Sequence, residues 1–204
     1  MGDDFKDFER RIRRMLRRRH MDASTVLQRL GHMACCLAMS GAEEYLRAAR
    51  LQMRRIDAAV NPGSRGRNGA RVFREIHFYM ICWDAIWKRL ELIKDTAGLR
   101  ALKQVLRPYR LEAIHYVLGR NELEHYVNRL RGRPKVKPLA SWDHGNLVGR
   151  TFMLAGRRWD VSRASLKRLN GLLRDFRLAI KTEGGAQLRA RQTRARPDSG
   201  STDR

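Results

Sequence analysis

The segment 70–94 constrains the fold most, because its apolar residues recur at alternating steps of four and three. The residues of this stripe are Val72, Ile76, Tyr79, Trp83, Ile86, Leu90 and Ile93. Such spacing places them on one side of an α-helix, which completes a turn every 3.6 residues. We therefore predict a central core helix over 70–94. His77 falls inside its apolar arc and is expected to be a core or edge histidine rather than a catalytic one.

Helical periodicity recurs along most of the remaining chain. Further helices are predicted over about 4–19, 22–39, 42–60, 97–106 and 109–131. We expect Ser40-Gly41 to separate two of these helices, with Ser40 and Glu43 forming a capping box for the second. Residues 61–69 (NPGSRGRNG) are dense in turn formers and are expected to form a loop.

The pattern changes after Pro138. Residues 150–161 are predicted to form a hairpin that turns at Ala155-Gly156. Ser162 is expected to cap a last helix, whose apolar side carries Leu166, Leu169, Leu173, Phe176 and Ile180. The predicted fold is thus an all-α helical bundle with a small β-hairpin before the last helix.

Composition along the chain suggests three regions. Residues 1–20 are predicted to be a basic amphipathic helix, and 22–181 a helical domain that includes the hairpin. Residues 182–204 contain almost no apolar side chain, so they are expected to be a disordered basic tail.

The charge balance limits the partners of this chain. It has 44 Lys and Arg residues against 21 Asp and Glu, a formal net charge of +23. A charge of this size repels itself in the compact state and suits the neutralisation of phosphates. A GC-rich coding sequence could favour Arg over Lys, but it does not explain the shortage of acids. We therefore expect a polyanionic partner, with nucleic acid as the leading candidate.

Three other features bear on cofactors and location. Cys35, Cys36 and Cys82 lie in apolar helical stretches without a C-x-x-C motif, so neither a disulfide framework nor a zinc site is expected. No other cofactor is expected. The chain begins Met-Gly-Asp-Asp, and no window has the length and apolarity of a membrane span. These features favour a cytoplasmic protein.

The segment 109–131 contains the pattern most relevant to function. One face of its first half carries Leu111, Ile114 and Leu118, and that face leads at helical spacing to polar residues. The later apolar residues 123, 127 and 130 lie nearly opposite. We therefore predict that either the buried face changes side across Gly119, through a bend or a restart of the helix, or polar groups occupy an inward-facing position. Asn121 and His125, four residues apart, are expected to face the same way.

The run Arg120-Asn121-Glu122-Leu123-Glu124-His125 resembles the R-x4-6-H motif of HEPN domains. Members of that family are helical bundles, frequently dimeric, and many are metal-independent ribonucleases or RNA-binding modules, several of them in toxin or defence systems. The resemblance covers this motif and the helical character of 70–131, and the hairpin is not part of it. It implies that Arg120 stabilises the phosphate, that His125 is the general acid/base, and that Asn121 orients them.

Histidine and arginine are suited to cleaving RNA without a metal ion. Histidine can move protons near neutral pH, and arginine can bind a phosphate through two parallel hydrogen bonds. Spacing alone does not identify which pair forms the site, because Arg110 and His115 also match the motif. Asn121 and the polar run around it favour the match at Arg120.

The sequence leaves several alternatives open. We expect Arg129, Arg131, Arg133, Arg157 and Arg158 to contact nucleic acid. The protein is then either a metal-independent endoribonuclease or a non-enzymatic nucleic-acid-binding or regulatory protein, and Arg120 and His125 could equally be structural. Expected protein partners are a second copy in a homodimer and an acidic protein. A membrane-surface or partner-binding role of the first helix is a third reading, although membrane contact is not expected.

Overall fold

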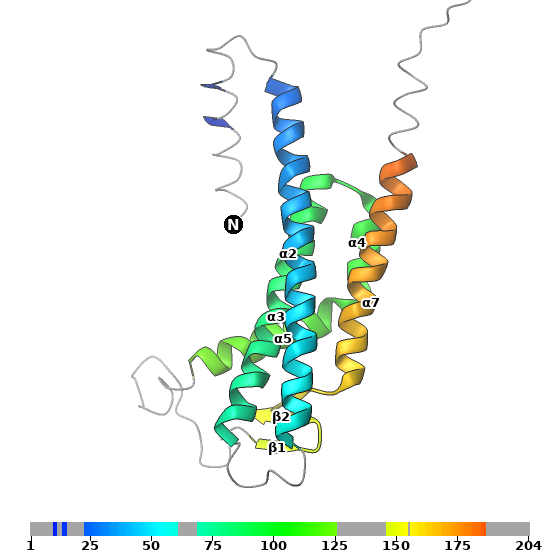
Figure 1. Cartoon of the computed structure of the whole chain (residues 1–204). Coiled ribbons are helices and arrows are strands. Elements are labelled where there is room, and N and C mark those ends of the chain that lie inside the picture. The colour runs from blue at the N-terminus through cyan, green and yellow to red at the C-terminus, as the bar shows by residue number, and fades with distance from the viewer. Residues whose placement is uncertain are drawn as a thin grey trace, which may run out of the picture.

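The computed structural model describes residues 10–11, 14–15, 23–60, 69–125, 146–154 and 156–186. Its principal helices are α2 (Ala23–Val60), α3 (Gly69–Ala97), α4 (Arg100–Leu106), α5 (Arg110–Glu124) and α7 (Arg163–Ala179). Three short strands, β1 (Asn146–Val148), β2 (Thr151–Leu154) and β3 (Arg157–Asp160), precede α7. The predicted helical bundle with a small β-structure before its last helix is confirmed (Figure 1).

Helix α3 is the centre of the core, as the periodicity predicted. Six residues of its stripe are buried, and Val72 is partly buried. The Tyr79 hydroxyl links α3 to α7 through a hydrogen bond with Ser165, and it also accepts a hydrogen bond from Trp83 Nε1 of α3 itself at 3.2 Å. The Trp83 ring also stacks on Tyr116 of α5, with 4.6 Å between the ring centroids.

Helix α2 runs alongside α3 without interruption (Figure 1). The predicted break at Ser40-Gly41 is therefore wrong, and Ser40 does not cap a helix. The buried stripe of α2 passes straight through this point, with Ala38, Ala42 and Leu46 on the same side. Gly41 has another role: a Cβ there would come within 2.6 Å of Arg89 Nε, so glycine allows the Arg89 side chain of α3 to lie against α2.

The strands form one antiparallel sheet in the order β1-β2-β3. The predicted hairpin corresponds to β2 and β3, in which Phe152 is paired with Trp159. Strand β1 was not predicted; it pairs with β2 after a turn at Gly149, whose φ is 60°. Phe152 and Trp159 are buried, and Trp159 Nε1 donates to the backbone oxygen of His115 at 2.9 Å. The sheet thereby covers one end of the bundle beside α5.

Helix α7 begins as predicted, because the Ser162 hydroxyl accepts a hydrogen bond from the Ala164 N–H at 3.0 Å. A π-helical turn, Ile180–Gly184, continues it past the point where the tail was expected to start. Glu183 in this turn accepts hydrogen bonds from the N–H groups of Arg100 (3.1 Å) and Ala101 (2.7 Å). A side chain 82 residues away in sequence thus caps the first turn of α4.

Some predicted regions lie outside the described residues. They include residues 61–68 of the predicted loop, residues 187–204 of the tail and most of the predicted helix over 4–19. Of that helix, the described residues 10, 11, 14 and 15 are helical and exposed. Within the described segments, no helix combines the length and the apolar content needed to cross a membrane.

Candidate functional site at the end of α5

Helix α5 is continuous, and its buried face does not change at Gly119. The buried residues are Ala113, Tyr116, Gly119 and Leu123, at helical spacing. The face expected to be buried is instead exposed, and Leu111 retains 84% of its accessible surface. Packing explains the difference, because a Cβ at position 119 would lie 2.6 Å from Trp159 Nε1 and 2.8 Å from Met80 Sδ. The helix thus buries the face on which a glycine permits the closest approach, rather than its most apolar face.

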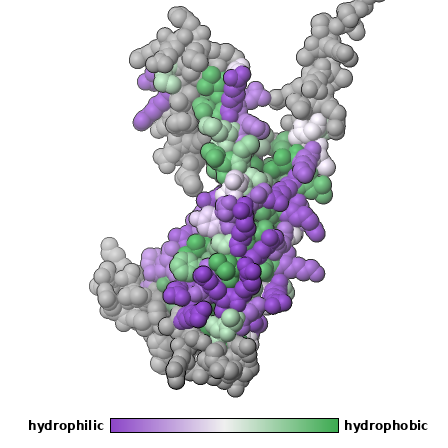
Figure 2. Space-filling view, viewed as in Figure 1, coloured by the Kyte–Doolittle hydropathy of each residue, from purple (hydrophilic) through white to green (hydrophobic). Residues whose placement is uncertain are grey.

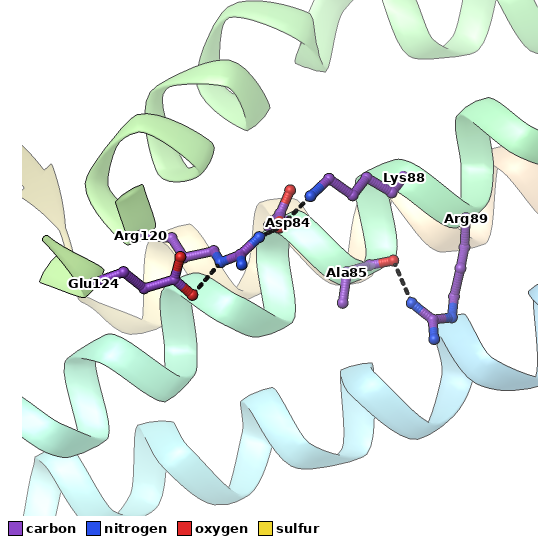
Figure 3. A network of polar contacts seen from close by, with 6 residues as sticks. All are labelled: Asp84, Ala85, Lys88, Arg89, Arg120 and Glu124. Carbon is purple, nitrogen blue, oxygen red and sulfur yellow. Dashed lines mark hydrogen bonds and ion pairs between the residues drawn. The ribbon is translucent and has the colours of Figure 1, made fainter. Parts of the chain in front are cut away.

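The motif residues sit where α5 ends. The helix stops at Glu124, and the backbone N–H of His125 closes it by donating to the Asn121 oxygen at 3.1 Å. The side chains of Asn121 and His125 are both exposed. Arg120, which directly precedes Asn121, instead extends toward α3 (Figure 3). The structure therefore leaves the asparagine and the histidine at the surface and directs the arginine to a neighbouring helix.

Arg120 joins two carboxylates from two helices (Figure 3). Its Nη1 donates to Asp84 Oδ2 of α3, and its Nε donates to Glu124 Oε1 at 2.8 Å. Asp84 also accepts from Lys88 Nζ at 2.9 Å, and its side chain is only 4% exposed. The hydrogen bond to Glu124 raises the pKa of Arg120 most, and the contact with Asp84 adds to this effect against the opposing effect of burial. Arg120 therefore compensates a buried negative charge.

A second imidazole lies near this network. His77 is partly buried at the edge of the core, as predicted, and it shares a face of α3 with Asp84, two turns further along. Burial lowers the pKa of His77; the charge of Glu124 opposes this shift, and that of Arg120 adds to it. Its buried Nε2 has no hydrogen-bond partner among the described residues. The sequence pattern assigned His77 to the core and did not place it near Arg120. The seven-residue spacing between His77 and Asp84, the partner of Arg120, could have indicated this proximity.

The competing match, Arg110 and His115, differs from this arrangement. The His115 ring stacks on Trp159 with 5.2 Å between centroids, and its Nε2 is hydrogen-bonded to the Arg158 backbone oxygen. His115 therefore holds the sheet against α5. Arg110 is exposed. Of the two matches, the one at Arg120 is the one whose histidine side chain lies exposed at a helix end.

The remaining predicted contact residues fall into two groups. Arg157 and Arg158 are exposed on β3, whereas Arg129, Arg131 and Arg133 lie outside the described residues. In the described part of the chain, no group of three or more His, Cys, Asp or Glu side chains could hold a metal ion. The three cysteines of this part form no disulfide: Cys82 is buried, Cys35 is half-buried and Cys36 is exposed.

Compared with protein-family models, with curated protein sequences and with solved structures, the chain has no match. The likeness to HEPN domains therefore rests on the motif at the end of α5 and stays a prediction.

Proposed function

We propose that this protein is an HEPN-like, RNA-directed protein that binds RNA through its surplus of cationic side chains. The observation that carries the proposal is the sharing of carboxylates. Three acidic residues each bind two cations, in the groups Arg55–Glu75–Arg74, Lys88–Asp84–Arg120 and Arg150–Asp57–Arg163. In these three groups one acid serves two cations, and the sequence as a whole is short of acids, with 21 Asp and Glu against 44 Lys and Arg.

This shortage follows from the composition. Pairing each of the 21 acids with one cation would still leave 23 of the 44 Lys and Arg residues without a partner. The phosphates of RNA supply negative charges at short, regular intervals. Each contact releases a counterion from the nucleic acid, which favours binding most at low salt. The exposed Arg157 and Arg158 are among the side chains available for such contacts.

Competition between polyanions tests the proposal. A fluorescently labelled single-stranded RNA is bound to the whole chain at low salt, and unlabelled RNA or polyglutamate of equal charge is added. We expect unlabelled RNA to displace the probe at a concentration at least ten times lower than polyglutamate. Equal displacement by the two polymers would reduce the function to unselective charge attraction, and the lack of any RNA binding would refute it.

RNA cleavage at the end of α5 is a second candidate function. It is favoured by the way Arg120 is held: the two hydrogen bonds use Nε and Nη1, and Nη2 has no acceptor among the described residues. A guanidinium anchored in this way can bind a phosphate through Nη2 without leaving Asp84. His125, five residues further on, is exposed.

These two side chains suit a transesterification without metal. The His125 imidazole would accept the proton of a ribose 2′-hydroxyl, whose oxygen attacks the adjacent phosphorus. The bond to the 5′-oxygen breaks, and that oxygen takes a proton from solvent. The products are a 2′,3′-cyclic phosphate and a 5′-hydroxyl end, while Arg120 stabilises the charge that develops on the phosphate.

An RNA digestion in EDTA separates cleavage from binding alone. For the enzyme we expect 2′,3′-cyclic ends with the wild type and at least a hundredfold slower cleavage with His125→Ala. His32→Ala, which removes an exposed histidine of α2, serves as the matched control. Arg120→Lys is preferred to Arg120→Ala, because removing the cation would leave Asp84 buried with Lys88 alone and destabilise the fold. Binding without any cyclic ends would leave the non-enzymatic function.

A further inference from the structure

A groove of about 570 Å³ lies between α2 and α7, which run side by side (Figure 1). This volume is within the range of about 300–1,000 Å³ that is usual for ligand sites. Its apolar lining comes from Met53 of α2 and Leu166 of α7. Its cationic lining also comes from both helices: Arg50 and Arg54 from α2, Arg163 and Lys167 from α7. None of the predicted nucleic-acid-binding residues lies here.

Two of the four cations are held in place by polar neighbours. Arg50 Nε donates to Asn170 Oδ1 at 3.2 Å, and Asn170 Nδ2 donates to the Leu166 backbone oxygen at 2.7 Å. On the other side, Arg163 Nε donates to Asp57 Oδ2 at 3.1 Å. The two guanidinium groups are therefore oriented before a ligand arrives, which lowers the entropy lost on binding.

The groove has an excess of positive charge. Among the described residues that line it, only Asp57 is acidic, and Asp57 is already shared between Arg150 and Arg163. Arg54 and Lys167 have no ion-pair partner among the described residues, and one lies on each helix. The N-terminus of α7 is at the same place, since Arg163 is its first residue, and its peptide dipoles add positive potential. Hydrophilic residues accordingly crowd the face that α2 and α7 turn to the viewer in Figure 2.

We infer that this groove binds the phosphodiester backbone of single-stranded RNA, an inference that rests on the proposed function. Arg54 and Lys167 contact phosphates from opposite walls, while Arg50 and Arg163 supply directed hydrogen bonds. Leu166, which is only partly buried, gives the ribose or base between the phosphates an apolar surface to lie against. The groove is the main RNA contact, separate from the end of α5.

The test compares two variants that lose the same charge. Arg54→Ser/Lys167→Ser removes two cations from the groove, and Lys103→Ser/Arg107→Ser removes two exposed cations of α4 and the turn after it, outside the groove. The affinity of the whole chain for a labelled single-stranded RNA is measured across a range of salt concentrations. Two lost phosphate contacts lower the slope of log affinity against log salt by about 1.4.

We expect that reduction, with at least tenfold weaker binding at low salt, for the groove variant alone. The control should bind within about threefold of the wild type. Cross-linking of photoreactive RNA should also label peptides of α2 and α7. Equal losses in both variants would overturn the groove inference while leaving RNA binding intact, whereas a wild type that does not bind RNA would overturn both.

Discussion

Gly119 is the residue at which α5 approaches the rest of the protein most closely. Any larger side chain there meets the Trp159 indole and Met80, both buried. Because Trp159 is packed between the sheet and His115, it cannot move without disturbing those contacts. A position that looks like a flexible point in the sequence is therefore one of the most restricted in the structure.

We predict that Gly119→Ala lowers the free energy of unfolding by about 1–3 kcal/mol, the usual effect of overpacking a core. Gly185→Ala is the matched control, because Gly185 has helical backbone angles and a methyl group there would meet nothing within 4 Å. That control should be neutral or slightly stabilising, since alanine favours helix more than glycine does. Urea denaturation of both variants measures the difference, and equal stabilities would contradict the close packing.

His77 gives the stability of the protein a predicted pH dependence. Its pKa is lowered in the folded state mainly by burial, so the folded protein binds a proton less readily than the unfolded chain. This histidine therefore costs no stability above the unfolded pKa of about 6.5, and it destabilises progressively as the pH falls through that value toward the folded pKa.

Replacing His77 should make the stability less sensitive to pH in that window. We expect the loss of unfolding free energy between pH 7.5 and pH 5.5 to be smaller in His77→Gln than in the wild type. His32→Gln, at an exposed position, controls for the removal of a histidine. An unchanged pH profile in His77→Gln would show that the imidazole is not shielded from solvent.

Among the helices and strands, prediction succeeded best where a single apolar stripe repeats and no second face of the helix is equally apolar. Helix α3 has such a stripe, and α7 adds a serine whose hydroxyl can cap it, so both were predicted close to their observed bounds. The hairpin of β2 and β3 was likewise visible from its turn. In these elements, local preference and tertiary packing favour the same structure.

Prediction failed where packing overrides a local signal. Ser40-Gly41 has the composition of a helix boundary, yet α2 continues through it with its buried stripe of Ala38, Ala42 and Leu46 intact. Leu111 and its apolar neighbours suggested the buried side of α5, yet the small and aromatic residues at 113, 116 and 119 fit the space beside Trp159. Strand β1 has only three residues and depends on pairing with β2. At the candidate site, the ion pair between Arg120 and Asp84 is a long-range contact that periodicity does not reveal.

The cap that Glu183 provides for α4 is another such long-range contact. Glu183 accepts two backbone N–H groups of a seven-residue helix whose preceding residue, Leu99, has no capping side chain. We predict that Glu183→Ala lowers the free energy of unfolding by about 1 kcal/mol, the typical cost of losing an N-cap. Glu44→Ala, which removes an exposed carboxylate paired with Arg47, should cost less, about 0.2–0.5 kcal/mol. Equal effects would mean that the Glu183 carboxylate does not hold α4.

In the molecule as a whole, the residues that stabilise the fold differ from the surface cations that are proposed to bind RNA. The core is built from α2, α3, α4, α5, α7 and the sheet, and its buried ionic groups are compensated locally, as at Asp84. Among the described residues, the cations without an ion-pair partner include Arg54 and Lys167, which are exposed at the groove between α2 and α7. Removing exposed cations of the groove, such as Arg54 and Lys167, should therefore weaken RNA binding with little effect on stability, because isolated surface charges contribute little to stability.

The salt dependence of RNA binding by the whole chain tests the central claim most directly. Four phosphate contacts, one for each cation of the groove, predict a slope of about −2.8 for log affinity against log salt. Affinity for a single-stranded RNA should then fall about 50-fold between 50 and 200 mM salt. Absence of binding at 50 mM salt, or an affinity that does not change over this range, would contradict the account.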